Sequence, residues 1–495
     1  MTEVLALEGI TKRFGPIAAN EDVTLHLDRG EVLALLGENG AGKTTLMNIL
    51  FGHYAADAGE VRVMGRPLPP GRPRAAIDAG VGMVHQHFAL AANLTVLDNV
   101  VLGSESLWRP RSDRTAARAR LLDLSDRFGL PVDPDARVAR LSVGERQRVE
   151  ILKALYRDAR ILILDEPTAV LARPEAARLF ETLRGMARGG LSVVFISHKL
   201  HEVMAGADRV AVLRGGRKVA ERATADTTPA ELAELMVGRR VERPVRRGRR
   251  PGAPMLVARD VRTDGLDGVS LTIRSGEILG IVGVSGNGQA ALGALLSGLS
   301  PPRHGTVTLD GRDVTRHGPR DMIRAGAARI PEDRNAEGVI GEMTVWENAV
   351  LERLADFSVG GFVRQRTARR HADALIERFD LRGAASGTRT RLLSGGNIQK
   401  LIVGRGLTTD PRFLLAAQPT RGLDEGAIAA VHAALLAARD AGAAILLITE
   451  ELDEALALAD RMQAIVKGRL SDPVAARDAD AGRLGLMMAG DWDAV

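Results

Sequence analysis

Apolar segments and glycine-containing loops alternate along the whole chain. Residues 32–36, 161–164 and 193–196 are apolar at nearly every position, rather than alternating between apolar and polar. Such uniform segments are typical of parallel strands that are buried on both faces of a sheet. Residues 43–50 follow the first of these segments and a glycine loop, and their pattern predicts a helix. Strands that alternate with helices in this way indicate an α/β fold.

One stretch between these strands has a different character. Residues 115–128 are polar and have the spacing of a surface helix. We therefore expect a helical subdomain inserted into the α/β core.

The chain contains two copies of this layout. Gly-Glu-Val-Leu at 30–33 recurs as Gly-Glu-Ile-Leu at 276–279, and Glu-Pro-Thr at 166–168 recurs as Gln-Pro-Thr at 418–420. In a chain of 495 residues, a repeat of this size predicts two homologous domains. We place the domains at residues 1–240 and 255–495, with a linker at 241–254.

The linker has the sequence VERPVRRGRRPGAP, whose prolines and glycines favour neither helix nor strand. Its arginines are compatible with contact to anionic lipid. A solvated linker is the simpler interpretation.

Composition excludes several kinds of chemistry. The absence of cysteine rules out disulfides, a thiolate nucleophile and cysteine-ligated metals. The 67 basic residues barely exceed the 62 acidic ones, so we attribute the pI near 9.8 to an arginine-rich surface and expect no nucleic-acid partner. No apolar segment approaches the roughly 20 residues of a membrane span, and the start does not resemble a signal peptide. We expect a cytoplasmic protein.

The first glycine loop carries a phosphate-binding motif. Residues 37–44, Gly-Glu-Asn-Gly-Ala-Gly-Lys-Thr, match G-x-x-x-x-G-K-[ST] between a predicted strand and a predicted helix. The backbone N–H groups of such a loop surround phosphates, Lys43 neutralises their charge and Thr44 ligates Mg²⁺. The predicted nucleotide-binding residues here are Gly37, Asn39, Gly40, Gly42, Lys43, Thr44 and Thr45.

Two carboxylates end the second apolar segment. Asp165 is expected to hold Mg²⁺ through water, and Glu166 to polarise the attacking water. Residues 141–145, Leu-Ser-Val-Gly-Glu, lie upstream and resemble the LSGGQ signature of ABC ATPases, with Val143 in place of its first glycine.

Three further residues fall in the order that this family shows. Gln86 stands at the Q-loop position, where it is expected to bind nucleotide and metal. His198 stands at the switch-histidine position, as a catalytic residue with Glu166 and Lys43. Phe14 stands where the family stacks an aromatic ring on adenine. His85 and His87 together offer only two ligands, so they predict no separate metal site.

The second copy lacks most of this machinery. The replacements are Gln289 for Lys43, Ala290 for Thr44, Ala417 for Asp165, Gln418 for Glu166, Glu332 for Gln86 and Glu450 for His198. No aromatic residue occurs between residues 255 and 283. The second signature, Leu-Ser-Gly-Gly-Asn at 393–397, and the Asp424 that follows it are better formed than their counterparts in the first half.

The chain resembles ABC ATPases over nearly its whole length. In that family each ATP lies between the P-loop of one domain and the signature of another. The resemblance implies one complete site and one nearly silent site, although a second half that merely completes the fold stays an alternative. The complete site would join Lys43, Asp165, Glu166 and His198 to Ser394, Gly395, Gly396 and Asp424.

Two classes of tandem ABC protein lack membrane spans: import ATPases and translation-associated proteins. The second class is expected to keep both P-loops and both catalytic carboxylates, with a long charged helical linker between the domains. This chain instead has one degraded site and a short proline-rich linker. Among import ATPases, the chain resembles the ribose/galactose type and, more closely, the nucleoside-uptake branch. The strings that carry this resemblance are residues 82–88, 93–96, 330–334 and 416–424.

This chain departs from the pattern of that branch at two places. Glu145-Arg146 stands where Gln-Gln is usual, and Ala172 stands where Thr is common. The resemblance implies an ATP-hydrolysing subunit at the cytoplasmic face of the inner membrane, bound peripherally to two permease subunits. An extracytoplasmic substrate-binding lipoprotein would deliver nucleosides, with simple-sugar import as the alternative. Whether the two halves pair within one chain or between chains stays open.

Overall fold

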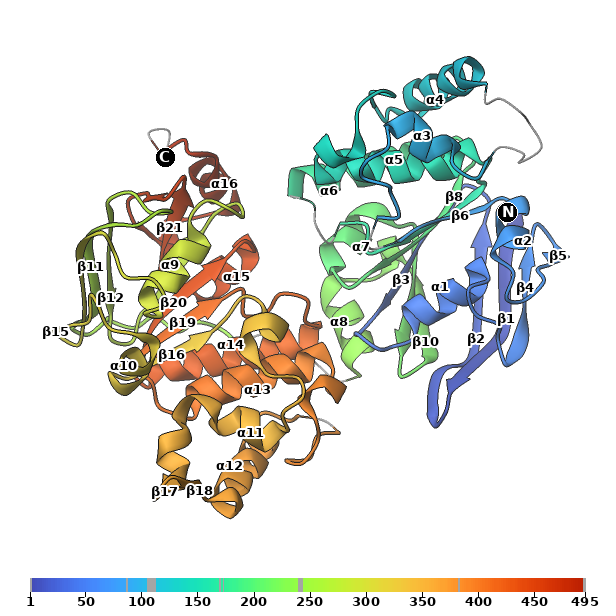
Figure 1. The fold of residues 1–495 in the computed structure, drawn as a ribbon. Coiled ribbons are helices and arrows are strands. Elements are labelled where there is room, and N and C mark those ends of the chain that lie inside the picture. The colour runs from blue at the N-terminus through green and yellow to red at the C-terminus, as the bar shows by residue number, and fades with distance from the viewer. Residues whose placement is uncertain are drawn as a thin grey trace. The chain divides into compact units, whose positions relative to one another are not determined.

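The chain forms two compact units, residues 1–241 and 242–495, each with its own sheets and helices (Figure 1). The computed structural model describes residues 2–85, 88–104, 113–168, 171, 173–238, 244–381 and 383–492. Gln86, His87 and Ala172, named above, lie outside the described residues.

The first unit contains a central sheet with the strand order β10-β9-β3-β8-β7-β6. All neighbours in it run parallel except β10 and β9. Its strands are β3 (Val32–Gly37), β6 (Val81–Val84), β7 (Ile161–Asp165), β8 (Ser192–Ser197), β9 (Arg209–Arg214) and β10 (Arg217–Ala223). A second, antiparallel sheet has the order β2-β1-β4-β5 and is formed by β1 (Glu3–Phe14), β2 (Ile17–Asp28), β4 (Ala58–Val63) and β5 (Arg66–Pro67).

Strand β3 shows why its apolar pattern does not alternate. Val32, Ala34 and Leu36 belong to the apolar cluster on one face of the sheet, while Leu33 and Leu35 belong to the cluster on the other. All five are at most 1% exposed, so each successive side chain enters a core. The prediction of parallel strands buried on both faces is confirmed.

The helices of the first unit are α1 (Lys43–Phe51), α2 (Pro73–Asp78), α3 (Val96–Val101), α4 (Arg114–Phe128), α5 (Val143–Tyr156), α6 (Arg173–Arg188), α7 (Leu200–Gly206) and α8 (Pro229–Val237). Helices α3 and α4 pack on α5 and form the inserted helical subdomain (Figure 1). Helix α4 covers the residues that its polar helical pattern predicts.

The second unit repeats this architecture. Its central sheet follows the order β16-β19-β20-β13-β21-β22, with β23 paired to β21. These strands are β13 (Ile278–Val282), β16 (Ala327–Ile330), β19 (Phe413–Ala417), β20 (Ala444–Thr449), β21 (Arg461–Val466), β22 (Arg469–Leu470) and β23 (Val474–Ala475). The antiparallel sheet β12-β11-β14-β15 is formed by β11 (Pro254–Arg262), β12 (Val269–Arg274), β14 (His304–Leu309) and β15 (Arg312–Asp313).

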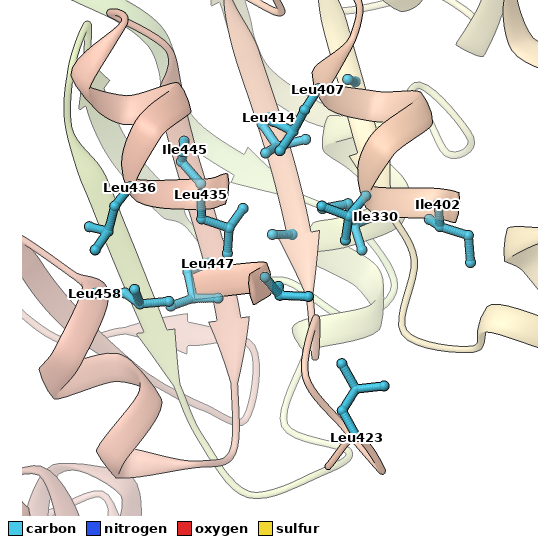
Figure 2. Close-up of a cluster of buried hydrophobic side chains, with 14 of the residues drawn as sticks. Ile330, Ile402, Leu407, Leu414, Leu423, Leu435, Leu436, Ile445, Leu447 and Leu458 are labelled. Atoms are coloured by element: carbon cyan, nitrogen blue, oxygen red, sulfur yellow. The ribbon is translucent and has the colours of Figure 1, made fainter. Parts of the chain in front are cut away.

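The helices of the second unit are α9 (Gln289–Leu296), α10 (Pro319–Arg324), α11 (Val345–Val350), α12 (Gln365–Arg378), α13 (Gly395–Leu407), α14 (Glu425–Asp440), α15 (Leu452–Leu458) and α16 (Ala481–Ala489). A small hairpin, β17 (Ser358–Val359) with β18 (Phe362–Val363), precedes α12. Figure 2 shows one of the two apolar cores of the second unit. Leucines and isoleucines from its strands and helices meet there, among them Leu414, Leu435 and Leu447.

The predicted linker begins the second unit and is attached to it. Residues 244–253 form neither helix nor strand. Arg439 of α14, which is 0% exposed, donates to Asp460 at 2.8 and 2.9 Å and to the carbonyl of Arg247 at 2.8 Å. Arg246 lies 3.4 Å from the same aspartate. A buried guanidinium therefore holds part of the linker against its own unit.

Candidate active site

The phosphate-binding motif of the first unit lies where β3 ends and α1 begins. Gly40 and Gly42 have φ angles of +83° and +96°, which side-chain-bearing residues rarely adopt. A Cβ on Gly42 would also lie 2.1 Å from the Ala19 carbonyl. Asn20, which is fully buried, donates to the Gly42 carbonyl at 3.2 Å. This loop therefore has the backbone geometry in which N–H groups of the loop and of the following helix turn can bind phosphate.

Lys43, the first residue of α1, is folded into the loop. Its ammonium donates to the carbonyls of Gly37 and Glu38 at 2.7 and 2.9 Å, and the residue is 6% exposed. A cation is therefore held in place against the phosphate-binding loop.

Asp165 and Glu166 follow each other at the end of β7. Burial raises the pKa of Asp165 to about 6, the neighbouring Glu166 charge adds to this rise, and Lys43 and a hydrogen bond with Thr44 oppose it. Glu166 has a φ of +46°, a strained conformation for a residue with a side chain.

His198 approaches Glu166 from the end of the neighbouring strand β8. Its Nδ1 lies 3.1 Å from Glu166 Oε1. This hydrogen bond is the main reason that the pKa of Glu166 is lowered, and the His198 and Lys43 charges add to the effect. The glutamate is therefore ionised and oriented.

The oxygen atoms at this site suit Mg²⁺. The Thr44 hydroxyl and the Asp165 carboxylate are hydrogen-bonded to each other, and hydroxyl and carboxylate oxygens are the ligands that this ion prefers. In the second unit Ala290 and Ala417 occupy the corresponding positions, which offer no side-chain oxygen.

Phe14 lies at the end of β1 and is 44% exposed. Its ring meets Tyr54 edge to face with centroids 5.5 Å apart, and the Lys12 ammonium lies 5.6 Å from its centroid. An exposed, supported ring can stack on a base. Sequence reasoning missed Tyr54, although it is one of only two tyrosines in the chain and follows α1 closely.

The two signature segments begin helices α5 and α13. Ser142 caps α5 in a capping box with Glu145, and Ser394 caps α13 by accepting from Asn397 N at 3.3 Å. Gly395 and Gly396 form the first turn of α13. Asp424 caps α14 by accepting from Ala427 N at 2.8 Å.

A contact that the sequence did not predict ties each signature helix to the turn after the neighbouring strand. Gln147 donates to the Pro167 carbonyl at 2.6 Å in the first unit. Gln399 donates to the Pro419 carbonyl at 2.8 Å in the second.

The second phosphate loop keeps its conformation without its cation. Gly286 and Gly288 have φ angles of +87° and +116°. Gln289 donates to the Val284 carbonyl at 2.9 Å and accepts from Asn287 N at 3.0 Å. An uncharged amide therefore occupies the position of the Lys43 ammonium.

The loop borders a hollow of about 790 Å³ that Glu332, Gln418 and Glu450 also line. Glu332 is paired with Arg421 at 2.7 Å. Burial raises the pKa of Glu450, while Arg421 and a hydrogen bond with Ser285 oppose the rise. This hollow has an uncharged amide, Gln289, where the first unit has Lys43, and a carboxyl group, Glu450, where the first unit has His198.

The first unit thus has the loop, the buried lysine and the strand-end carboxylates that define a P-loop nucleotide hydrolase. The ABC transporter family profile matches residues 20–169 and 266–421. The chain is 44% identical to the glucose import ATP-binding protein TsgD13 of Haloferax volcanii, over 99% of this chain and 96% of the relative. It is 42% identical to the nucleoside import ATP-binding protein NupA of Lactococcus lactis, over 98% of each.

A ribose import ATP-binding protein, RbsA 1 of Rubrobacter xylanophilus, is 40% identical over the full length of both chains. Among solved structures, the archaeal ribosome recycling factor aABCE1, in complex with a ribosomal stalk protein, matches with a TM-score of 0.64 and 18% identity. That match covers 98% of this chain and 92% of the other, and it shows the fold alone.

The chain belongs to the ABC transporter family. It is the ATP-hydrolysing subunit of an ABC importer, with two tandem ATP-binding domains. Such subunits work with membrane permeases and a substrate-binding protein. Within the residues that the structure describes, no helix has the length and apolar character of a membrane span.

Proposed function

We propose that the first unit carries the catalytic ATP site and that the second unit completes it. The observation that carries this proposal is the contrast between matching strand ends. The first unit has a lysine, two carboxylates and a histidine at these places: Lys43, Asp165, Glu166 and His198. The second unit has Gln289, Ala417, Gln418 and Glu450 at the matching positions.

The side chains of the first unit divide the chemistry between them. Lys43 neutralises the β- and γ-phosphate oxygens of ATP, and the loop N–H groups bind the remaining oxygens. Glu166 accepts a hydrogen bond from the attacking water and aligns it with the γ-phosphorus. His198 holds Glu166 ionised and in position. Phe14 stacks on adenine.

Thr44 and Asp165, with Gln86 as predicted, would hold Mg²⁺. When bound, the ion neutralises charge on the phosphate oxygens as it builds up. Asn39 and Thr45 complete the set of loop residues that bind nucleotide.

We propose that Ser394, Gly395, Gly396 and Asp424 meet the γ-phosphate from the opposite side in the closed state. Domain ranges of 1–240 and 255–495, joined by residues 241–254, fit this division of labour. Formation and hydrolysis of the closed state would drive two permease subunits, to which the chain binds at the cytoplasmic face of the inner membrane.

Nucleosides are the proposed cargo, delivered by an extracytoplasmic lipoprotein. The strings at residues 82–88 and 416–424 support this choice, as do two relatives named for nucleoside and guanosine import at 42% and 43% identity. Simple sugars are the second candidate, because relatives named for glucose and ribose import lie at 44% and 40%.

The test is ATPase activity of membranes that contain this chain and its permeases, with binding protein added. Stimulation by nucleoside supports the proposal, and stimulation by glucose or ribose alone would transfer the chain to sugar import. Lys43→Ala in the same membranes should abolish the stimulated activity. Stimulated activity that survives Lys43→Ala would contradict the assignment of the catalytic site to the first unit.

A further inference from the structure

The second signature segment lies against a cation that comes from a distant part of the chain. Arg334 begins a π-helical turn, Arg334–Gly338, that packs against α13. A Cβ added to Gly395 would lie 2.8 Å from an Nη atom of Arg334 and 3.0 Å from its Cζ. The guanidinium therefore fills the space that a side chain at position 395 would need.

The same guanidinium contacts the turn that leads to Asp424. Arg334 Nη1 donates to the Arg421 carbonyl at 3.0 Å. A Cβ on Gly422 would lie 3.6 Å from an Nη atom of Arg334. One side chain thus connects the first turn of α13 to the loop that begins α14.

The charge of Arg334 is incompletely balanced. Burial lowers the pKa of Arg334, but guanidinium groups stay protonated in proteins. The adjacent Asp333 carboxylate accepts from Asn335 N and Ala336 N, both at 2.9 Å. Within the described ranges, no ion pair of 4.0 Å or less includes Arg334. Positive charge therefore lies behind the N-terminus of α13.

The first unit has the opposite arrangement. Val143 corresponds to Gly395, and its side chain would exclude a guanidinium at that place. In the first unit, Phe88 stands at the position that aligns with Arg334. A Cβ on Gly144, the next residue, would lie 3.3 Å from a carboxylate oxygen of Glu175. One signature thus has a cation beside its first turn, and the other has an anion.

We propose that Arg334 is a positioning residue for ATP hydrolysis. Its charge makes the second signature selective for a nucleoside triphosphate over a diphosphate. This inference rests on the proposed function, in which that signature receives the γ-phosphate of ATP held by the first unit. The N-terminus of α13 already presents partial positive charge to an anion, and Arg334 adds a full charge behind it. ADP lacks the γ-phosphate, so the added charge favours closure on ATP. The hydrogen bond to the Arg421 carbonyl also holds the turn that carries Asp424.

The test compares Arg334→Gln, Arg334→Lys and wild type as the full chain in membranes with the permeases. KM for ATP, kcat and the inhibition constant for ADP are measured for each. For Arg334→Gln we expect KM for ATP to rise about tenfold, the equivalent of roughly 1.4 kcal/mol. The ADP constant should change less than about twofold, because ADP binds to the loop of the first unit alone. Arg334→Lys should recover most of the loss, since it restores the charge.

Glu175→Gln is the matched control, because it removes the charge beside the other signature and should leave all three constants unchanged. Two results would overturn the inference: wild-type constants in Arg334→Gln, or equal weakening of ATP and ADP without recovery in Arg334→Lys. Failure of the proposed function would show separately, as Lys43→Ala membranes that keep full activity.

Discussion

The Glu166 carboxylate and the His198 imidazole, 3.1 Å apart, join the ends of two adjacent parallel strands. Glu166 accepts the hydrogen bond as a carboxylate, because its pKa is lowered by this very contact. Nδ1 of His198 must then carry the proton of this hydrogen bond. The pair therefore fixes both the charge and the direction of the carboxylate that we propose to orient the attacking water.

Removal of the imidazole should leave Glu166 unsupported. For His198→Ala we expect kcat to fall about 10²-fold or more, with a smaller change in KM, because an oriented base contributes on this scale. Steady-state ATPase measurements with the permeases present provide the check. His201→Ala, on the same segment but outside the site, is the control. A kcat within twofold of wild type in His198→Ala would show that Glu166 does not depend on this hydrogen bond.

The two strand ends should respond differently to substitution. Glu166→Gln should bind ATP yet hydrolyse it about 10²- to 10³-fold more slowly, since the amide cannot accept a proton from water. Gln418→Ala, at the matching position of the second unit, should alter turnover less than about twofold. Equilibrium ATP binding and turnover measured side by side distinguish the two effects. Equal loss of turnover from both changes would refute a single catalytic site.

The buried guanidinium of Arg439 should be important for stability of the second unit. Arg439→Met removes its bonds to Asp460 and to the linker carbonyl of Arg247. Loss of one partner of a buried ion pair costs about 3–5 kcal/mol, so the unfolding transition of the second unit should move to lower denaturant concentration.

Arg477→Ala is the control for this change, because Arg477 is exposed and its pair with Asp478 is at the surface. Urea unfolding followed by circular dichroism measures both variants. A shift in Arg439→Met no larger than that of Arg477→Ala would show that the buried pair adds nothing.

Glu450 should make the second unit less stable as pH rises. Its pKa is raised above the ordinary value of 4.5, chiefly by burial, so the folded state holds the proton more tightly than the unfolded chain. Stability is therefore lost between pH 4.5 and the raised pKa, as this partly desolvated carboxyl ionises. Glu450→Gln removes this titration, so its melting temperature should exceed that of wild type by more at pH 7 than at pH 4. A pH-independent difference would mean that Glu450 does not titrate as described.

Local sequence patterns predicted the fold and much of the candidate site. Segments such as β3 and β7 are recognisable in the sequence because burial on both faces leaves no polar position. The phosphate loop is recognisable because its backbone geometry requires glycines at a fixed spacing. Contacts such as Arg439 with Asp460, or Arg334 with Gly395, join residues far apart in the chain. No periodicity or motif spacing connects such pairs, so only the folded chain reveals them.

The roles assigned to Phe14, Gln86, Ser394 and Asp424 remain predictions. Phe14 lies on the surface beside Tyr54, as a base-stacking ring would. Gln86 lies outside the described residues. Ser394 and Asp424 are seen as helix caps, and their predicted contact with ATP depends on closure of the two units.

Glu166 and Gln418 share nearly the same left-handed backbone, with φ angles of +46° and +47°. Their N–H groups also make equivalent bonds, to Ile196 O at 3.1 Å and Ile448 O at 2.8 Å. In the second unit this kink no longer aims a carboxylate, but it still starts the turn that ends at Asp424. The second unit has therefore kept the backbone conformation of this turn without its catalytic side chain. A designer who wished to restore catalytic groups to the second unit would exchange side chains at Gln289, Ala290, Ala417, Gln418 and Glu450, and could keep this turn as it is.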